Sequence, residues 1–319
     1  MKTYNVILII SLIIFLTSCN GGETPITKFN PYQGSDGVVM ELLDNAPPDQ
    51  IYEEDSFNVV VKLHNKGAYD ISRDNGEWVY FRIVYDPFYF DMYENYNSQY
   101  ATDLTAKDLF DHYGQFITKE FLLQSKKIEG QRENPTSKML FNLCYPYQTL
   151  VTEDVCIDRD PFNLDVRDKP CTSRDITLTD QGAPIAVKKI EPRMPTKIDN
   201  DQVWVKPNFQ ITLKNVGGGN VIRRTNELLD KQCIVKDTDQ QYWGSINVTA
   251  KLGNFDLDCS PEYATFYDGE ALVNCQLPGD GFILLSPVSQ PDVLVINTSY
   301  IYVTAESHDI SILRQQTLP

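Results

Sequence analysis

The stretch "VVVKLHNKGAYDI", residues 59–71, carries the pattern that decides the fold. Apolar residues recur at every second position from 57 to 63, which is the period of a β-strand with one buried face. Asn65 and Gly67 follow directly. Asparagine side chains bond nearby backbone amides and glycine tolerates positive φ, so this pair is typical of a turn. We therefore predict a strand that ends in a turn.

The same pattern returns in the second half of the chain as "FQITLKNVGGGNV", residues 209–221. Three alternate apolar positions, an asparagine, a glycine two residues later and a β-branched residue four further on all correspond. Asn215 and Gly217 thus repeat Asn65 and Gly67. A repeat of this kind predicts two similar domains of roughly 130 to 150 residues.

Short apolar and β-branched runs fill the rest of both halves, with Gly, Pro, Asn and Asp clusters between them. The runs lie at 38–43, 78–85, 116–128, 138–145, 152–157, 185–190, 203–205, 246–252, 271–277 and 296–303. Many short strands with almost no helix predict an all-β chain of two tandem immunoglobulin-like antiparallel β-sandwiches. We place them at 37–182 and 183–313, joined within "TDQGAPIAVKKIEP", residues 179–192.

One helix is predicted inside a long insertion of the first domain. Its apolar residues at helical spacing are Ala106, Leu109, Phe110 and Tyr113. Thr105 is a suitable N-cap with Asp108 three residues on, and Gly114 is a suitable stop. These signals predict a short helix over 105–113.

The N-terminus reads as an export signal. Residues 6–16 are apolar except for Ser11, and eleven residues are too few to span a bilayer as a helix. The sequence Leu16-Thr17-Ser18-Cys19 resembles a lipobox. We expect residues 1–18 to be a signal peptide, Cys19 to be lipidated and residues 19–36 to form a tether. The alternative is ordinary cleavage near Ser18, which leaves a secreted protein with a spare thiol.

Charge and cysteine content narrow the classes of partner and cofactor. The net charge of -16 argues against nucleic acid and anionic membrane surfaces, which would repel the chain. The six cysteines after Cys19 are an even number, which favours disulfides in an exported protein. We favour Cys156–Cys171 and Cys259–Cys275 and leave Cys144 and Cys233 open. No C-x-x-C occurs, so zinc is not expected. No metal and no cofactor are predicted, and calcium in the acidic loop is the one alternative considered.

His64 and Asp70 are the candidates for catalysis in the opening stretch. A catalytic histidine needs an orienting partner. His64 falls in the outward phase of its strand, however, and the repeat has Lys214 and Asn220 in place of the two residues. No H-E-x-x-H, G-x-S-x-G, Walker or dinucleotide motif is present either. The sequence therefore predicts a protein that is not an enzyme.

The acidic loop at residues 158–170 offers two interpretations. Its aspartates are Asp158, Asp160, Asp165 and Asp168. Calcium prefers such oxygen ligands, but the EF-hand spacing is missing. Arg159, Arg167 and Lys169 offer ion-pair partners to the same carboxylates. We expect a solvated loop of mixed charge and keep calcium as the alternative.

Aromatic residues crowd into residues 80–100, where there are nine. The part at 85–100 continues past any ordinary strand and is rich in tyrosine. A possible binding surface for a protein or a glycan is formed by Phe88, Tyr89, Tyr93, Tyr96 and Tyr100. The alternative is an insertion that packs on its own domain. Two N-glycosylation patterns, at Asn247 and Asn297, lie within predicted strands and are a weak signal.

The repeated "apolar-x-apolar-x-apolar-x-Asn-x-Gly" stretch resembles strand B and the following turn of CARDB-type immunoglobulin-like domains. The wider set "NAPP", "NKGAYD", "CYPY", "QGAPIAV" and "NVGGG" resembles archaeal surface lipoproteins that have two such domains and no settled activity. The resemblance implies a non-enzymatic cell-surface lipoprotein that acts as an envelope scaffold or protein-binding module. A glycan-binding adhesion protein is the alternative. The expected partners are the membrane, through the lipid, and another envelope protein or a surface glycan.

Overall fold

A computed structural model describes residues 29–94, 97–130, 134–160, 162, 164, 168–225, 237–279, 281–284 and 288–315. The predicted signal peptide, Cys19 and most of the predicted tether lie outside the described residues. Residues Pro31–Pro319 form one compact unit, separate from Met1–Asn30. Within the described ranges, no helix has the length and apolar character needed to cross a bilayer.

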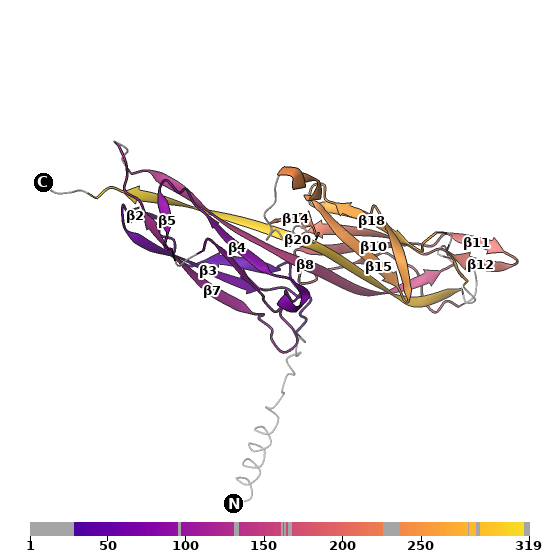
Figure 1. The fold of residues 1–319 in the computed structure, drawn as a ribbon. Coiled ribbons are helices and arrows are strands. Elements are labelled where there is room, and N and C mark those ends of the chain that lie inside the picture. The colour runs from indigo at the N-terminus through magenta and orange to yellow at the C-terminus, as the bar shows by residue number, and fades with distance from the viewer. Residues whose placement is uncertain are drawn as a thin grey trace, which may run out of the picture. The chain divides into compact units, whose positions relative to one another are not determined.

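The fold is all-β and its strands pair antiparallel, except for β2 and β20, which are parallel (Figure 1). The strands up to residue 177 are β1 (Val38–Leu42), β2 (Gln50–Tyr52), β3 (Ser56–Asn65), β4 (Val79–Val84), β5 (Phe90–Met92), β6 (Gln99–Thr102), β7 (Phe116–Ser125), β8 (Thr136–Asp158) and β9 (Ile176–Thr177). Those that follow are β10 (Ile185–Arg193), β11 (Thr196–Asp199), β12 (Gln202–Val205), β13 (Asn208–Asn215), β14 (Asn220–Arg223), β15 (Ser245–Leu252), β16 (Phe255–Ser260), β17 (Tyr263–Thr265), β18 (Glu270–Gln276), β19 (Ile283–Leu284) and β20 (Ser289–Leu313).

Three sheets contain these strands. One has the order β1-β3-β7-β5, and a small one has the order β11-β12-β19. The largest runs β6-β4-β8-β20-β15-β16-β18-β13-β10-β9, with β2, β14 and β17 paired beside this path. Helical structure in the described ranges is limited to two 3₁₀ turns, η1 (Arg73–Asn75) and η2 (Asp237–Tyr242).

The alternating pattern of the opening stretch is confirmed. Val59, Val61 and Leu63 of β3 are fully buried, and the positions between them are less so. Strand β13 repeats this burial with Phe209 and Ile211. The surroundings also correspond, because β3 lies between β1 and β7 just as β13 lies between β10 and β18.

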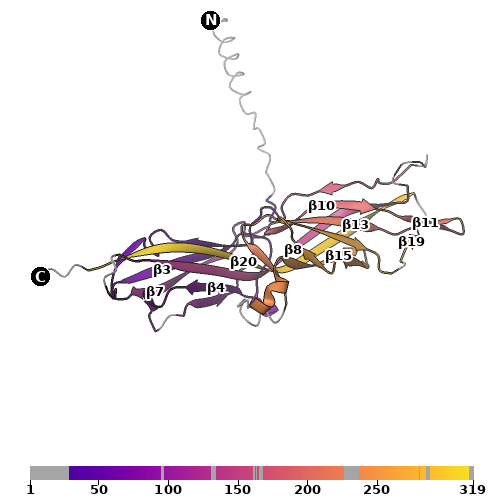
Figure 2. The same cartoon turned by 90° about the horizontal axis from the view of Figure 1, so that it is seen from above.

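Strands β8 and β20 pair with each other and so connect the two halves of the sequence (Figure 2). They have 23 and 25 residues, and the whole of β8 pairs with residues 289–311 of β20, with Pro146 facing Ile301. Sequence patterning predicts two strands, 138–145 and 152–157, where the structure has only β8. The predicted boundary between residues 182 and 183 stays a prediction. A domain boundary at this position assigns β20 to the second half of the chain. Residues 299–311 of β20, however, pair with residues 136–148 of the first half.

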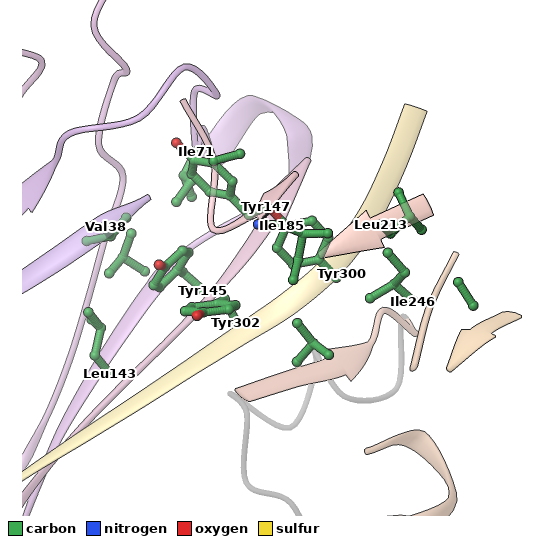
Figure 3. Packing of buried hydrophobic residues seen from close by; sticks show 14 of the residues in the cluster. Val38, Ile71, Leu143, Tyr145, Tyr147, Ile185, Leu213, Ile246, Tyr300 and Tyr302 are labelled. Carbon is green, nitrogen blue, oxygen red and sulfur yellow. Dashed lines mark hydrogen bonds between the residues drawn. The ribbon is translucent and has the colours of Figure 1, made fainter. Parts of the chain in front are cut away.

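Four buried tyrosines lie near the middle of the β8–β20 pair (Figure 3). They are Tyr145, Tyr147, Tyr300 and Tyr302. Ring centroids lie 5.6 Å apart for Tyr145 and Tyr147, 5.9 Å for Tyr145 and Tyr302, and 6.4 Å for Tyr147 and Tyr300. Burial raises the pKa of all four phenols, so they remain neutral donors and acceptors in the core. One hydrophobic core therefore extends across both halves.

The predicted helix over 105–113 is wrong. The described chain there has no regular structure, because side-chain carboxylates bind backbone amides that a helix would need for itself. Asp108 Oδ1 accepts from Phe110 N and Asp111 N, both at 2.6 Å. Asp111 Oδ1 accepts from Tyr113 N at 3.0 Å and Gly114 N at 3.2 Å. Such local bonds compete with helix formation.

Both favoured disulfides are confirmed. Cys156 of β8 is bonded to Cys171, and Cys259 of β16 to Cys275 of β18. Cys144 is disulfide-bonded as well. Cys233 lies outside the described residues. Disulfides of this kind are compatible with an extracellular location.

Glu53 holds the end of β20 in the first half, and we expect its charge to contribute to stability. Its buried carboxylate accepts from Ile128 N at 2.8 Å and Gln315 N at 3.1 Å. The Ile128 amide is the main cause of a lowered pKa. Replacing Glu53 with Gln should lower the free energy of unfolding by about 1–2 kcal/mol at pH 7.

The pH dependence gives the control for Glu53. The pKa of Glu53 is lower in the folded chain than in the unfolded chain, where it is about 4.3, so the ionised carboxylate stabilises the fold above that pH. This stabilisation is lost as the pH falls through the folded-state pKa. Urea unfolding should therefore show the difference between Glu53→Gln and the parent chain shrinking towards pH 3. Glu54→Gln, on the neighbouring exposed side chain, should have little effect. If Glu53→Gln lowered the free energy of unfolding equally at pH 7 and pH 3, the stabilising role of the Glu53 charge would be contradicted.

Candidate functional site

The turn after β3 is built around the side chain of Asn65, which is fully buried. Its Nδ2 donates to Tyr69 O at 2.9 Å and Leu104 O at 3.1 Å. Its Oδ1 accepts from Gly67 N and from the Tyr147 hydroxyl, each at 3.2 Å. Every polar atom of the amide group is thus used, and the turn is bound to β8 and to the segment after β6.

Asn215 performs the same task in the second copy. Its Nδ2 donates to Gly219 O at 2.9 Å, and its Oδ1 accepts from the Tyr302 hydroxyl at 3.0 Å. The same hydroxyl accepts from Gly219 N at 2.8 Å. In each half, an asparagine at the end of a strand is therefore hydrogen-bonded to a tyrosine of β8 or β20.

Gly67 and Gly217 lie in these turns, but for a reason that differs from the predicted one. Neither has a positive φ. Space is the constraint instead. A Cβ on Gly67 would meet the Tyr147 hydroxyl and lie 2.6 Å from Gly182 O. On Gly217 it would meet the Tyr302 hydroxyl and lie 2.8 Å from Pro184 Cβ. The glycines are required because the tyrosines approach the backbone.

His64 and Asp70 both bond the segment between β6 and β7, which we call the 104–116 loop. The Nε2 of His64 lies 2.7 Å from Tyr113 O. Oδ1 of Asp70 accepts from Ala106 N at 2.6 Å. The two side chains thus fix opposite ends of the loop.

Further bonds make the 104–116 loop a defined structure. Asn65 N donates to Gln115 O at 3.0 Å, and Lys107 N donates to Gly67 O at 3.1 Å. The backbone N–H groups of Asp111 and Phe110 lower the pKa of the Asp108 carboxyl. Asp108 is therefore a stable anion at neutral pH and keeps its tight turn. The loop is shaped by its own carboxylates and by the Asn65 turn.

The apolar side chains of the 104–116 loop point outward. Their exposed fractions are 66% for Leu109, 97% for Phe110, 81% for Tyr113 and 57% for Phe116. Helical patterning predicts that the first three face the core. A rigid loop with four exposed large apolar residues is uncommon on a soluble surface and is typical of contact sites. The signal in the sequence that favours the loop is Asp108 and Asp111 ahead of Gly114, since aspartate favours turns over helix.

The predicted aromatic surface is divided between core and solvent. Phe88 and Tyr93 are exposed, whereas Tyr89 and Tyr100 are partly buried against the core. The Tyr93 hydroxyl lies 2.7 Å from Ser56 Oγ, and Lys119 Nζ lies 5.0 Å from the Tyr100 ring. Tyr96 lies outside the described residues. The described aromatics therefore do not form one flat platform, and their role as a binding surface stays a prediction.

A buried ion pair joins the first half to the second. Arg224 Nη1 lies 2.6 Å from Glu77 Oε1, and Glu77 is only 1% exposed. The single proton of the Tyr69 hydroxyl is shared between the two carboxylate oxygens, which lie 2.8 and 2.9 Å from the hydroxyl oxygen. Burial and the neighbouring Glu77 raise the pKa of Tyr69 to about 12. Gln148 Nε2 on β8 donates to Tyr69 in turn, at 3.1 Å.

The acidic loop is charge-paired where it is described, but these pairs are buried and not solvated as predicted, because Asp158 is fully buried and the Lys169 side chain is only 9% exposed. Lys169 Nζ lies 3.1 Å from Asp158 Oδ2 and 3.4 Å from Asp160 Oδ2. Asp168 is exposed, and Asp165 and Arg167 lie outside the described residues. In the parts of the chain that the structure describes, no three His, Cys, Asp or Glu side chains are grouped closely enough to hold a metal ion.

The two glycosylation patterns occupy facing positions of one sheet. Asn247 of β15 faces Ser299, and Asn297 of β20 faces Thr249. Both asparagines are half-buried, and Asn247 Nδ2 donates to Arg224 O at 3.3 Å. They help to cover the sheet.

A groove flanks β8. It has a volume of about 940 Å³ and is lined by residues 152–156, by part of the segment 171–177, and by Pro192 and Pro291. Burial, with the nearby charge of Asp154, raises the pKa of Glu153 in its wall. The pairs described for this part of β8 are with β20 alone, so its other edge faces the groove.

Comparisons with known proteins leave the family open. No model of a known protein family matches the chain, and no curated protein matches it. A biofilm-associated protein BSP domain is 11% identical in sequence to this chain, with a TM-score of 0.16. The match covers 92% of this chain and 54% of that structure. The alpha-2-macroglobulin of E. coli is 10% identical, with a TM-score of 0.16 over 88% of this chain. The C-terminal domain of Streptococcus agalactiae AgI/II polypeptide BspA is 8% identical, with a TM-score of 0.16 over 88% of this chain and 100% of its own. The chain spans 54% and 16% of the first two structures.

Proposed function

We propose that this protein is a non-enzymatic cell-surface lipoprotein and acts as an envelope scaffold with a protein-binding groove. In this proposal its halves are two immunoglobulin-like β-sandwiches of the CARDB type, anchored through lipid on Cys19. The observation that carries the scaffold role is the pairing of β8 with β20 along 23 positions across both halves.

The shared strands favour a role in holding two regions at a fixed separation. Domains joined by a linker reorient unless their interface is large and apolar. Here the two halves share the four-tyrosine core, and the Glu77–Arg224 pair joins them. Each half also fixes its asparagine turn to one of the long strands. A unit built this way resists bending between its halves, which suits a scaffold.

The groove beside β8 supports the protein-binding part of the proposal. Residues 152–156 face it with one strand edge, and unpaired N–H and C=O groups on an edge can add an extended segment of another protein. Glu153, Asp154 and Asp175 give its wall an acidic character, which Arg174 partly offsets. A basic extended segment would fit best.

Lipid labelling tests the anchor directly. Cells that express the full chain are fed a radiolabelled fatty acid, and we expect label in the parent protein and none in Cys19→Ser. Ser18→Ala is the matched control, because a small residue before the cysteine preserves the cleavage site and should keep the label. Label that persists in Cys19→Ser would refute the proposed anchor.

A further inference from the structure

The 104–116 loop is a fixed structure that presents apolar side chains to solvent. Phe110 is 97% exposed and Tyr113 is 81% exposed. Hydrogen bonds hold the backbone of this loop in place, because Asp108 and Asp111 accept from four of its amides and Asp70 accepts from a fifth. Apolar groups held in place together at a surface are typical of an interaction site.

The loop lies beside the point where the folded unit begins. Lys107 Nζ donates to Gln33 O, and Lys66 N of the adjoining turn donates to Gly37 O at 2.9 Å. The compact unit starts at Pro31. The loop is thus held against the first residues of this unit.

The predicted anchor limits how far this part of the unit can be from a bilayer. Eleven residues lie between Cys19 and Pro31, so twelve residue-to-residue steps join the two. Fully extended, they span at most about 40 Å, and a relaxed chain of that length spans roughly half of it. The 104–116 loop therefore remains within reach of the surface that holds the lipid.

We propose that the 104–116 loop is a second membrane contact, which inserts Leu109, Phe110 and Tyr113 into the interfacial layer of the bilayer that carries the Cys19 lipid. This inference rests on the proposed lipoprotein anchor. Aromatic rings with an apolar body, and tyrosine with its hydroxyl, are enriched at the level of lipid headgroups. A single acyl chain anchors a protein only marginally, and a second membrane contact strengthens such an attachment. The net charge of -16 indicates a neutral or zwitterionic lipid surface.

Quenching by brominated lipid tests the contact. The full lipidated chain carrying Phe110→Trp is reconstituted into phosphatidylcholine vesicles whose acyl chains are dibrominated. Tyr267→Trp is the matched control, because Tyr267 is 79% exposed in the turn between β17 and β18 of the second half. The unsubstituted chain gives the background of Trp78, Trp204 and Trp243. We expect the tryptophan at 110 to be quenched at least twofold more than that at 267.

Two further measurements separate the possible outcomes. Adding Leu109→Ser and Tyr113→Ser to the Phe110→Trp chain should reduce quenching to the level of the control. If the chain floats with the vesicles but tryptophans at 110 and 267 are quenched equally, the proposed membrane contact of the loop is overturned. The exposed loop would then be a candidate contact for a protein partner. A chain that does not float with the vesicles would refute the anchor, and the loop contact with it.

Discussion

Replacing Arg224 with methionine is expected to lower the free energy of unfolding by about 3–5 kcal/mol, because it leaves a buried carboxylate without its partner charge. Glu77 is 1% exposed and Arg224 is 21% exposed, so little water can replace the guanidinium. The Tyr69 hydroxyl still donates to Glu77, but a neutral hydroxyl does not balance the charge. Methionine keeps most of the aliphatic volume, which confines the change to charge and hydrogen bonding.

Arg73→Met is the matched control for Arg224→Met. Arg73 Nη2 lies 3.2 Å from Asp103 Oδ1, in a pair of which both members are well exposed. Surface pairs of this kind contribute about 0–1 kcal/mol. Urea unfolding of the two variants should therefore differ by several kcal/mol, although each removes one arginine from one ion pair. Similar losses would mean that Glu77 is hydrated in solution.

The cooperativity of the Arg224→Met variant tests the scaffold proposal at the same time. Arg224 follows β14 in the second half, and Glu77 precedes β4 in the first. Because β8 and β20 pass through both halves, we expect one unfolding transition for the parent and for the variant, monitored by tyrosine absorbance and by far-ultraviolet circular dichroism. Two separate transitions would contradict a shared core.

The strands were predictable from sequence because their alternation is a local property. The period of two in β3 and β13, and the identical spacing of Asn and Gly after each, depend on neighbouring residues alone. The union of 138–145 with 152–157 into β8 was not predictable. The stretch "PYQTLV", residues 146–151, lies between them and begins with a proline, which interrupts most strands, yet Pro146 pairs with Ile301 in the middle of β8 and β20. Only the partner strand, some 150 residues away, makes this pairing possible.

The candidate site was less predictable than the fold, because some of its contacts are long-range and its local signals conflict. Leu109, Phe110 and Tyr113 have helical spacing, whereas Asp108 and Asp111 favour turns, and the local sequence does not decide between these two signals. The role of the turn glycines was also hidden. Their place in a turn follows from sequence, whereas the approach of a tyrosine from β8 or β20 depends on tertiary packing.

Gly67→Ala should be among the most damaging single-methyl additions in the chain, at about 2–4 kcal/mol. The added Cβ meets the Tyr147 hydroxyl and also two backbone oxygens, 2.5 Å away at Asp36 and 2.6 Å away at Gly182. Backbone atoms from two segments cannot move aside without loss of their own hydrogen bonds. Gly218→Ala is the control, since nothing lies within 4 Å of a Cβ at that position. It should be neutral or stabilise the fold by a few tenths of a kcal/mol.

Gly217→Ala tests whether the second turn obeys the same rule through its tyrosine. A Cβ at 217 meets the Tyr302 hydroxyl first, and this hydroxyl bonds both Asn215 Oδ1 and Gly219 N. We expect Gly217→Ala and Tyr302→Phe each to be destabilising, by about 2–3 and 1–2 kcal/mol. The double variant should cost less than the sum, since the phenylalanine removes the oxygen with which the methyl collides. For Gly67→Ala with Tyr147→Phe the losses should nearly add, because the backbone oxygens remain. If the losses of Gly217→Ala and Tyr302→Phe were strictly additive in a double-mutant cycle, the clash with the Tyr302 hydroxyl would not be the reason that residue 217 must be glycine.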